Sequence, residues 1–210
     1  KHTVLATTTM YKPNKDGIWE SEIEMRAKLA LMMFAKARNL GYDIACVDGN
    51  SDSGWRNKAT DLGVKIVDEN PSKYPGKHFM GKSRRQVLDL AGNLGSHETI
   101  TWLEPEKHTY VLNSKGESPL AMNAAPVYGG VADSTVPRRI DLSLYPAAQQ
   151  TAEMTANLIA FNMMKQYFEK KGLDISKVHY LDYCSGPRTF NKNFLDYYLK
   201  YPGEINGKDH

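Results

Sequence analysis

The chain has 210 residues, of which 41% are hydrophobic and 24% are charged, and its formal net charge is +3 at pH 7. This length fits one large domain or two small ones, with enough residues to bury a substantial core. So small a net charge does not favour nucleic acid or an acidic membrane surface as a partner, so any phosphate binding must rely on locally placed Lys and Arg. No apolar run approaches the roughly 18 to 20 residues of a membrane span, and we expect a soluble, cytoplasmic protein.

In the first half of the chain, short apolar or β-branched segments alternate with segments of helical periodicity. Strands are predicted at Thr3 to Thr9, Ile44 to Val47, Val64 to Val67 and Thr99 to Leu103. Helices are predicted from a capping-box sequence at Ser21 to Leu40, from about Gly54 to Leu62, and from near Gly81 through Ala91. This alternation is typical of a parallel sheet flanked by helices.

The second half is less regular. Val127 to Asp133 resembles a strand, Thr151 to Lys171 has the pattern of a long helix, and Val178 to Tyr183 is a further predicted strand. The turn residues Ser185-Gly186-Pro187-Arg188 are expected to lead directly into a last helix through Tyr198.

Asp48 closes the central predicted strand and is followed by turn-forming residues. Ligands of open α/β sheets bind in the crevice at the carboxyl ends of the strands, so Asp48 is a candidate ligand residue. The alternative is an ordinary strand-to-helix turn whose Asp and Ser side chains cap the next helix. The residue pattern alone leaves both interpretations open.

Charged residues also gather at two later positions. Lys82, Arg84 and Arg85 lie where the third helix is expected to begin, and could either meet phosphate groups or form a solvated helix face. Glu104 and Glu106 follow the fourth strand, and could either hold a hard cation or form a charged exit from the strand.

The order of these pieces resembles the GT-A fold of nucleotide-sugar glycosyltransferases, in particular the family-two-like and mannosylglycerate-synthase-like enzymes. Four motifs carry the resemblance: Val47-Asp48-Gly49-Asn50-Ser51-Asp52, Gly81-Lys82-Ser83-Arg84-Arg85, Glu104-Pro105-Glu106 and Ser185-Gly186-Pro187-Arg188-Thr189-Phe190. It implies a three-layer α/β/α sandwich with a mostly parallel central sheet. It also implies a single domain over 1–210, with a nucleotide-sugar-binding half at 1–108 and an acceptor-side half at 109–210. For this second half three alternatives stay open: it is shortened at its C-terminus, another residue takes the catalytic role, or catalysis is weak or absent.

The resemblance also implies roles for individual residues. The donor would be a GDP- or UDP-sugar, with Mg²⁺ or Mn²⁺ bridging its phosphates. Glu104 and Glu106 would be the metal ligands. The nucleotide-sugar-binding residues would be Thr8, Tyr11, Asp48, Lys82, Arg84, Arg85, Gly186 and Arg188.

Two departures from the family pattern bear on activity. Glu-Pro-Glu stands in place of Asp-x-Asp, and the usual downstream catalytic residue is not identifiable, which leaves Asp182 and Asp133 as the carboxylates available for catalysis. The leading hypothesis is a metal-assisted glycosyltransferase, most naturally a hexosyltransferase, acting on an unidentified acceptor. The alternative is a non-catalytic nucleotide-sugar-binding or interaction module on the same fold. A sugar nucleotidyltransferase is disfavoured because the loop after the first strand, Ala6 to Met10, has no glycines.

Overall fold

The computed structural model of the chain describes residues 3–74, 79–139, 145–182, 184–200, 204–205 and 208–209. These residues belong to two compact units. The sheet unit comprises Lys1–Thr135 and Arg188–His210, and the helical unit comprises Val136–Pro187. No helix in the described part of the chain is both long and apolar enough to cross a membrane.

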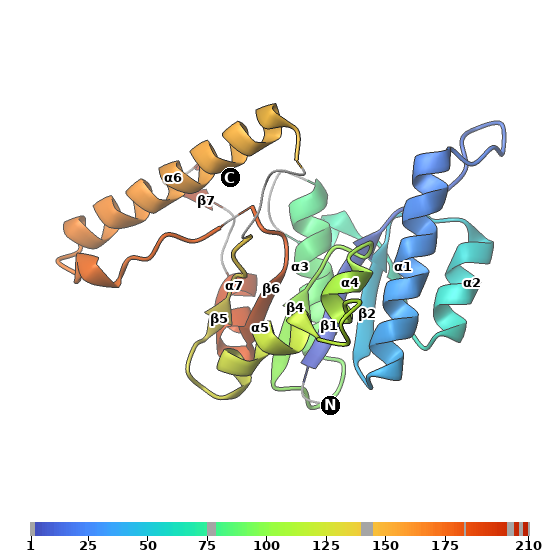
Figure 1. Cartoon of the computed structure of the whole chain (residues 1–210), viewed down its shortest axis with the longest axis horizontal. Coiled ribbons are helices and arrows are strands. Elements are labelled where there is room, and N and C mark those ends of the chain that lie inside the picture. The colour runs from blue at the N-terminus through green and yellow to red at the C-terminus, as the bar shows by residue number, and fades with distance from the viewer. Residues whose placement is uncertain are drawn as a thin grey trace. The chain divides into compact units, whose positions relative to one another are not determined.

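The sheet unit is built on a six-stranded sheet in the order β3-β2-β1-β4-β6-β5 (Figure 1). Its strands are β1 (Thr3–Thr9), β2 (Asp43–Asp48), β3 (Lys65–Asp68), β4 (Thr99–Trp102), β5 (Ser134–Thr135) and β6 (Arg188–Asn191). The pairs β1–β2, β2–β3 and β1–β4 are parallel, whereas β6 runs antiparallel to both β4 and β5. The mostly parallel α/β architecture predicted from the sequence is therefore confirmed.

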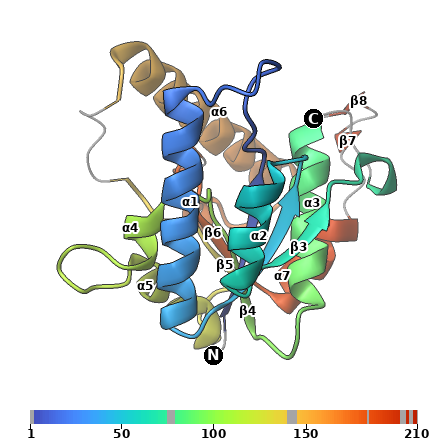
Figure 2. The same ribbon diagram turned by 90° about the vertical axis from the view of Figure 1, so that its right-hand side faces the viewer.

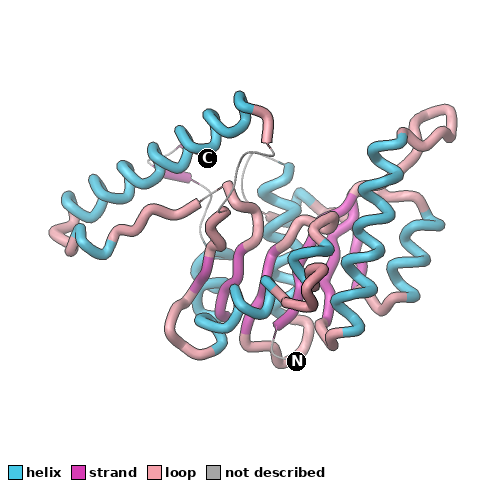
Figure 3. Tube along the Cα trace, viewed as in Figure 1, coloured by secondary structure: helices cyan, strands magenta, loops and turns pink. Residues whose placement is uncertain are grey.

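Helices cover both faces of this sheet (Figures 2 and 3). One face carries α1 (Ser21–Asn39), α2 (Ser53–Asp61), α4 (His108–Val111) and α5 (Pro119–Tyr128), and the other carries α3 (Phe79–Gly92) and α7 (Lys192–Lys200). Smaller elements are the 3-10 turn η1 (Pro71–Lys73) and the hairpin of β7 (Glu204–Ile205) with β8 (Lys208–Asp209).

Side chains of the buried strands point alternately to the two faces of the sheet, and each face has its own hydrophobic core. In β1, Leu5 packs into the core under α1, whereas Val4 and Ala6 pack into the core under α3. Successive side chains of a strand point to opposite faces, so a strand covered on both faces reads as one continuous apolar run. That pattern makes β1 and β2 recognisable from the sequence.

Four features predicted from the sequence differ from the structure. The segment predicted as a strand at 127–133 instead contains the end of α5, and the strand there is the two-residue β5. No strand forms over 178–182, and residue 183 lies outside the described residues. The strand β6 separates the Ser-Gly-Pro-Arg turn from α7. The capping box at Ser21 does not form, because the N-cap is Glu20 and its side chain makes no capping bond.

The helical unit consists of the long helix α6 (Ala147–Lys170), the short 3-10 turn η2 (Ile175–Lys177) and the extended segments on either side. The long helix confirms the prediction from the sequence, although it begins four residues earlier than expected. Its one fully buried residue is polar, Asn157, which belongs to a cluster around Asp182 described below.

Candidate functional site

The carboxyl ends of β1, β2, β3 and β4 meet along one edge of the sheet. Register pairs Thr9 with Asp48, and Asp48 with Asp68. The strand order reverses between β1 and β4, because β1 continues to β2 on one side while β4 lies on the other. In open α/β sheets such a reversal opens a crevice at the carboxyl ends of the strands, where ligands bind.

Two adjoining hollows form a groove along this edge. The larger, about 410 Å³, is lined by the end of β1, including Thr8, by Tyr11 in the segment that follows it, and by the segment after β4. The smaller, about 340 Å³, lies over the ends of β2 and β3. Both hollows are lined by Gly49 and Glu69, so these two residues lie where the hollows meet.

Asp48 lies at the smaller hollow, but its carboxylate is engaged within the protein. Thr9 Oγ1 donates to Asp48 Oδ1 at 2.7 Å, and the hydroxyl of Ser51 donates to the same oxygen. The backbone N–H of Ser51 donates to Oδ2 at 2.8 Å, and Arg56 Nη1 lies 3.5 Å from it. The Asp48 side chain is fully buried. Its visible role is to shape the turn after β2; ligand binding stays a prediction.

Tyr11 and Glu106 connect the two loops that line the larger hollow. The Tyr11 hydroxyl donates to Glu106 Oε1 at 2.7 Å, and Arg26 Nε donates to the same oxygen at 2.8 Å. Burial, reinforced by the charge of Glu106, raises the pKa of Tyr11. The predicted metal ligand Glu106 is therefore already neutralised by Arg26 from α1.

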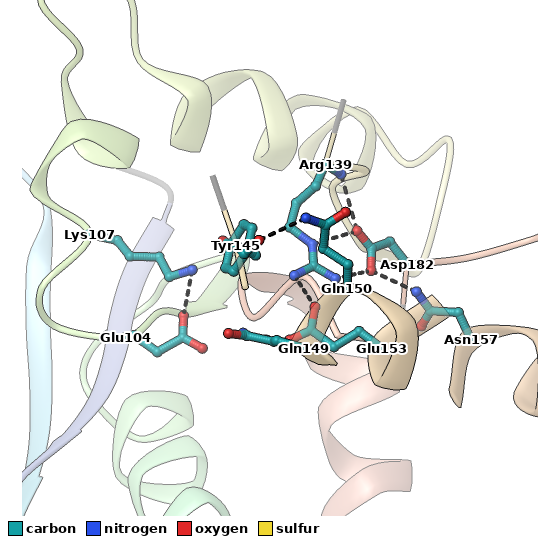
Figure 4. Close-up of polar contacts among 9 residues, drawn as sticks. All are labelled: Glu104, Lys107, Arg139, Tyr145, Gln149, Gln150, Glu153, Asn157 and Asp182. Atoms are coloured by element: carbon teal, nitrogen blue, oxygen red, sulfur yellow. Dashed lines mark hydrogen bonds and ion pairs between the residues drawn. The ribbon is translucent and has the colours of Figure 1, made fainter. Parts of the chain in front are cut away.

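Glu104 fits a hard cation better than Glu106 does. Its Oε2 atom is buried without a hydrogen-bond partner and forms an ion pair with Lys107 Nζ at 3.6 Å (Figure 4). Carboxylate oxygens are ligands that Mg²⁺ and Mn²⁺ prefer, and this one has no hydrogen bond to give up. Within the described residues, no three His, Cys, Asp or Glu side chains gather into a complete metal cage.

The three basic residues predicted to bind phosphate have different surroundings. Because α3 begins at Phe79, Lys82 lies in its first turn, whereas Arg84 and Arg85 lie in its second turn. Arg84 lines the larger hollow, with its guanidinium carbon 4.3 Å from the centre of the Trp102 ring. Arg85 is buried and donates to the backbone oxygen of Tyr198 at 2.8 Å, so it ties α3 to α7. Lys82 is half-buried in the first turns of α3.

Arg188 and Asp133 lie at opposite ends of β4, as the pairing of β4 with β6 shows. Arg188 pairs with Trp102, so it lies at the edge of the sheet that carries the groove. Asp133 accepts a hydrogen bond from Asn191 Nδ2 at 2.7 Å, and Asn191 pairs with Thr99 at the opposite end of β4. Asp133 therefore lies at the edge opposite the groove, which argues against the catalytic role considered for it.

Asp182 is the centre of a polar cluster inside the helical unit (Figure 4). Its carboxylate accepts from Arg139 Nη2 at 2.7 Å, from Arg139 Nε at 2.8 Å and from Asn157 Nδ2 at 2.9 Å. Arg139 also donates to Glu153. Burial opposes ionisation of Asp182, but the hydrogen bonds from Arg139 and Asn157 outweigh it and lower its pKa to about 2. A carboxylate so strongly stabilised is a poor general base. Gly186, in the same unit, has a φ of +84°.

Three side chains of the groove were not identified from the sequence. Arg26 and Trp102 lie in regular elements with no motif, and Glu69 is an isolated polar residue directly after β3. Only the position of Glu69 directly after β3 carried a usable signal, because it follows a strand at the ligand-binding edge.

No protein-family model matches this sequence, and no curated protein matches it. Among solved structures, glucosyl-3-phosphoglycerate synthase from Mycobacterium tuberculosis, in complex with Mn²⁺, UDP-glucose and phosphoglyceric acid, matches with a TM-score of 0.53 and 11% identity. The same enzyme with Mg²⁺ and UDP matches with a TM-score of 0.51 and 10% identity. Both alignments cover 92% of this chain and 57% of the other chain. The chain therefore has the GT-A fold of nucleotide-sugar transferases, and spans little more than half the length of these structures.

Proposed function

We propose that this chain transfers a sugar, most naturally a hexosyl group, from a UDP- or GDP-sugar to an acceptor that the structure does not identify. The observation that supports the proposal is the groove at the strand-order reversal of a GT-A sheet, lined by residues that follow β1 and β4. The structural neighbours bind UDP and UDP-glucose, which favours a nucleotide sugar as the donor.

Arginine side chains supply part of the charge that a donor diphosphate requires. Arg84 lines the groove from α3 and is stacked on Trp102, which restricts its side chain before a ligand binds. Arg188 lies at the same edge of the sheet. A planar guanidinium donates two parallel hydrogen bonds to phosphate oxygens, so Arg84 is well suited to this role.

A divalent cation would contribute the remaining charge. When bound, Mg²⁺ or Mn²⁺ stabilises the negative charge that develops on the departing nucleoside diphosphate. Glu104 is the residue that would hold it, because its Oε2 has no hydrogen-bond partner and the cation would replace only the ion pair with Lys107 at 3.6 Å. Glu106 would act differently, since its bonds to Tyr11 and Arg26 fix the two loops on which the groove depends.

A second function, a nucleotide-sugar-binding module without transfer activity, is favoured by a specific observation. The two carboxylates considered for catalysis are unsuited to it, because Asp133 lies at the opposite edge of the sheet and Asp182 is held by Arg139. Binding requires neither of them.

Donor turnover distinguishes the two functions. The chain is incubated with UDP-glucose or GDP-mannose and Mn²⁺, and release of free UDP or GDP is measured by chromatography. A transferase releases nucleotide faster than the buffer does, with water as the default acceptor, and loses this activity in Arg84→Gln while retaining it in the matched control Asp133→Asn. Donor binding without release supports the module. Absence of donor binding contradicts both.

A further inference from the structure

Asp48 is the carboxylate that the sequence offers to the nucleoside, yet its oxygens already accept bonds from Thr9 and Ser51. The next strand places a second carboxylate, Glu69, at the same edge. We propose that Glu69 reads the nucleobase of the donor, and that it selects bases whose hydrogen-bonding edge carries a ring N–H, namely uracil and guanine. This inference rests on the proposed nucleotide-sugar donor.

Glu69 is fixed from both sides. Its backbone N–H donates to the carbonyl oxygen of Asp48 at 3.0 Å, which anchors the residue to the end of β2. Its Oε1 accepts a hydrogen bond from the hydroxyl of Ser83 on α3. A carboxylate held in this way presents its second oxygen in one direction, as a residue that determines specificity must do.

The second oxygen, Oε2, faces the floor of the groove. A Cβ atom built on Gly49 would lie 3.5 Å from Glu69 Oε2 and 3.5 Å from the Cβ of Met10. No described residue donates a hydrogen bond to Oε2. The glycine backbone and the Met10 side chain, which is 61% exposed, provide an open, partly apolar surface on which a flat ring can lie with its edge toward Glu69.

The chemistry of a carboxylate defines the ligand edge. An ionised carboxylate only accepts hydrogen bonds, and an unpaired one repels the phosphates of the donor. It therefore suits the uncharged, donor-bearing end of the nucleotide. Uracil presents N3–H and guanine presents N1–H, whereas cytosine and adenine present an unprotonated ring nitrogen at the equivalent place, whose lone pair the carboxylate repels.

Isothermal titration calorimetry of the whole chain with UDP, GDP, CDP and ADP tests this inference. For the wild type we expect UDP or GDP to bind at least about 10-fold more tightly than CDP and ADP, because a site built for a hydrogen bond rejects a ligand that lacks it. The Glu69→Gln side chain both donates and accepts, so we expect the preference of UDP over CDP to fall below about 3-fold.

Two further variants keep the test specific. Glu169→Gln makes the same chemical change at an exposed position of α6 and is expected to keep the wild-type preference. Gly49→Ala adds only ordinary contacts, so the fold is retained, but its methyl group covers the floor and should weaken all the nucleotides about equally.

The outcomes separate this inference from the proposed function. If no nucleotide binds the wild type, the proposed function itself fails. If nucleotides bind but UDP and CDP bind equally, or if Glu69→Gln leaves the ratio unchanged, only the role of Glu69 is overturned. The role of Glu69 is also overturned if Glu69→Gln weakens the binding of UDP but not that of 2′-deoxy-UDP. The carboxylate would then bind the ribose hydroxyl and not the base.

Discussion

At the scale of single residues, Glu104 and Glu106 illustrate how two similar carboxylates two positions apart acquire different roles. The sequence assigns both to a cation. In the structure Glu106 is bonded to Tyr11 and Arg26, while Glu104 has a buried oxygen without a hydrogen-bond partner. The pairing of Glu106 with Arg26 cannot be predicted from the sequence, because the two residues are 80 positions apart. Only the folded chain brings them together.

This difference predicts distinct results for the two substitutions. Glu104→Gln should weaken Mn²⁺ binding in the presence of UDP by at least about 10-fold, because losing even a residue that only supports a metal ligand costs about 10-fold or more in affinity. Glu106→Gln should instead lower the thermal stability by about 1 kcal/mol through its weakened hydrogen bonds. Titration of free Mn²⁺ by electron paramagnetic resonance measures the first effect. Equal losses of Mn²⁺ binding in both variants would restore Glu106 as a ligand.

Asp182 provides a prediction with a pH dependence. Asp182→Asn should destabilise the helical unit by about 2 kcal/mol at neutral pH, because the guanidinium of Arg139 loses one of its two charged partners among the described residues and keeps only Glu153. The folded pKa of Asp182, about 2, lies below the unfolded value of about 3.9. Its contribution is therefore complete above the unfolded pKa and is lost as pH falls toward about 2.

Thermal melts followed by circular dichroism from pH 6 to pH 2 measure this effect. The difference in melting temperature between wild type and Asp182→Asn should narrow as the pH falls. Glu169→Gln, an exposed change on α6, should melt with the wild type throughout. A difference that stays constant over the whole range would show that the charge of Asp182 is not what stabilises the cluster.

At the scale of secondary-structure elements, α3 has two arginines with opposite functions. Arg84 lines the groove beside Trp102, whereas Arg85 bonds to the backbone of Tyr198 and packs over its ring. Consecutive residues of a helix point in directions about 100° apart, so one of these adjacent positions faces the groove and the other faces the core.

These neighbours form a matched pair for mutagenesis. Arg84→Gln should weaken UDP binding by about 10-fold or more while changing the melting temperature little, since it removes a charge-assisted phosphate contact. Arg85→Gln should lower stability by about 1 to 2 kcal/mol and leave the affinity of the folded protein for UDP almost unchanged. Calorimetric titration and thermal unfolding of both variants provide the comparison. The reverse pattern would assign the phosphate contact to Arg85.

The elements that were wrongly predicted from the sequence have one feature in common: their local residue preferences do not decide their structure. The segment ending α5, around Val127 and Tyr128, contains β-branched and aromatic residues that favour strands, but the helix is set by its start, where Ser118 caps the chain and Pro119 follows. The short strands β5 and β6 depend on pairing with each other and with β4. Such tertiary pairing overrides local propensity, so these elements are not readable from sequence periodicity.

At the scale of the whole molecule, the sequence predicted the sheet better than the site. Continuous apolar strands such as β1 and β2, each followed by a periodic helix, require a parallel sheet covered on both faces, and the ligand edge follows from that topology. The individual site residues were less predictable, because the partners of each carboxylate come from distant elements. Both oxygens of Asp48 accept hydrogen bonds from Thr9 and Ser51, whereas within the described part of the chain Glu69 accepts one from Ser83 through Oε1 alone.

The most direct test of the account is a thermal-shift screen of the wild-type chain with UDP, GDP, ADP and CDP, each with and without Mn²⁺. A nucleotide present at a hundred times its dissociation constant stabilises a folded protein by about 2.7 kcal/mol, which such a screen readily detects. We expect UDP or GDP to raise the melting temperature, Mn²⁺ to increase this shift, and Arg84→Gln to remove it. No shift with any nucleotide at millimolar concentration would contradict the claim that this groove binds a nucleotide sugar.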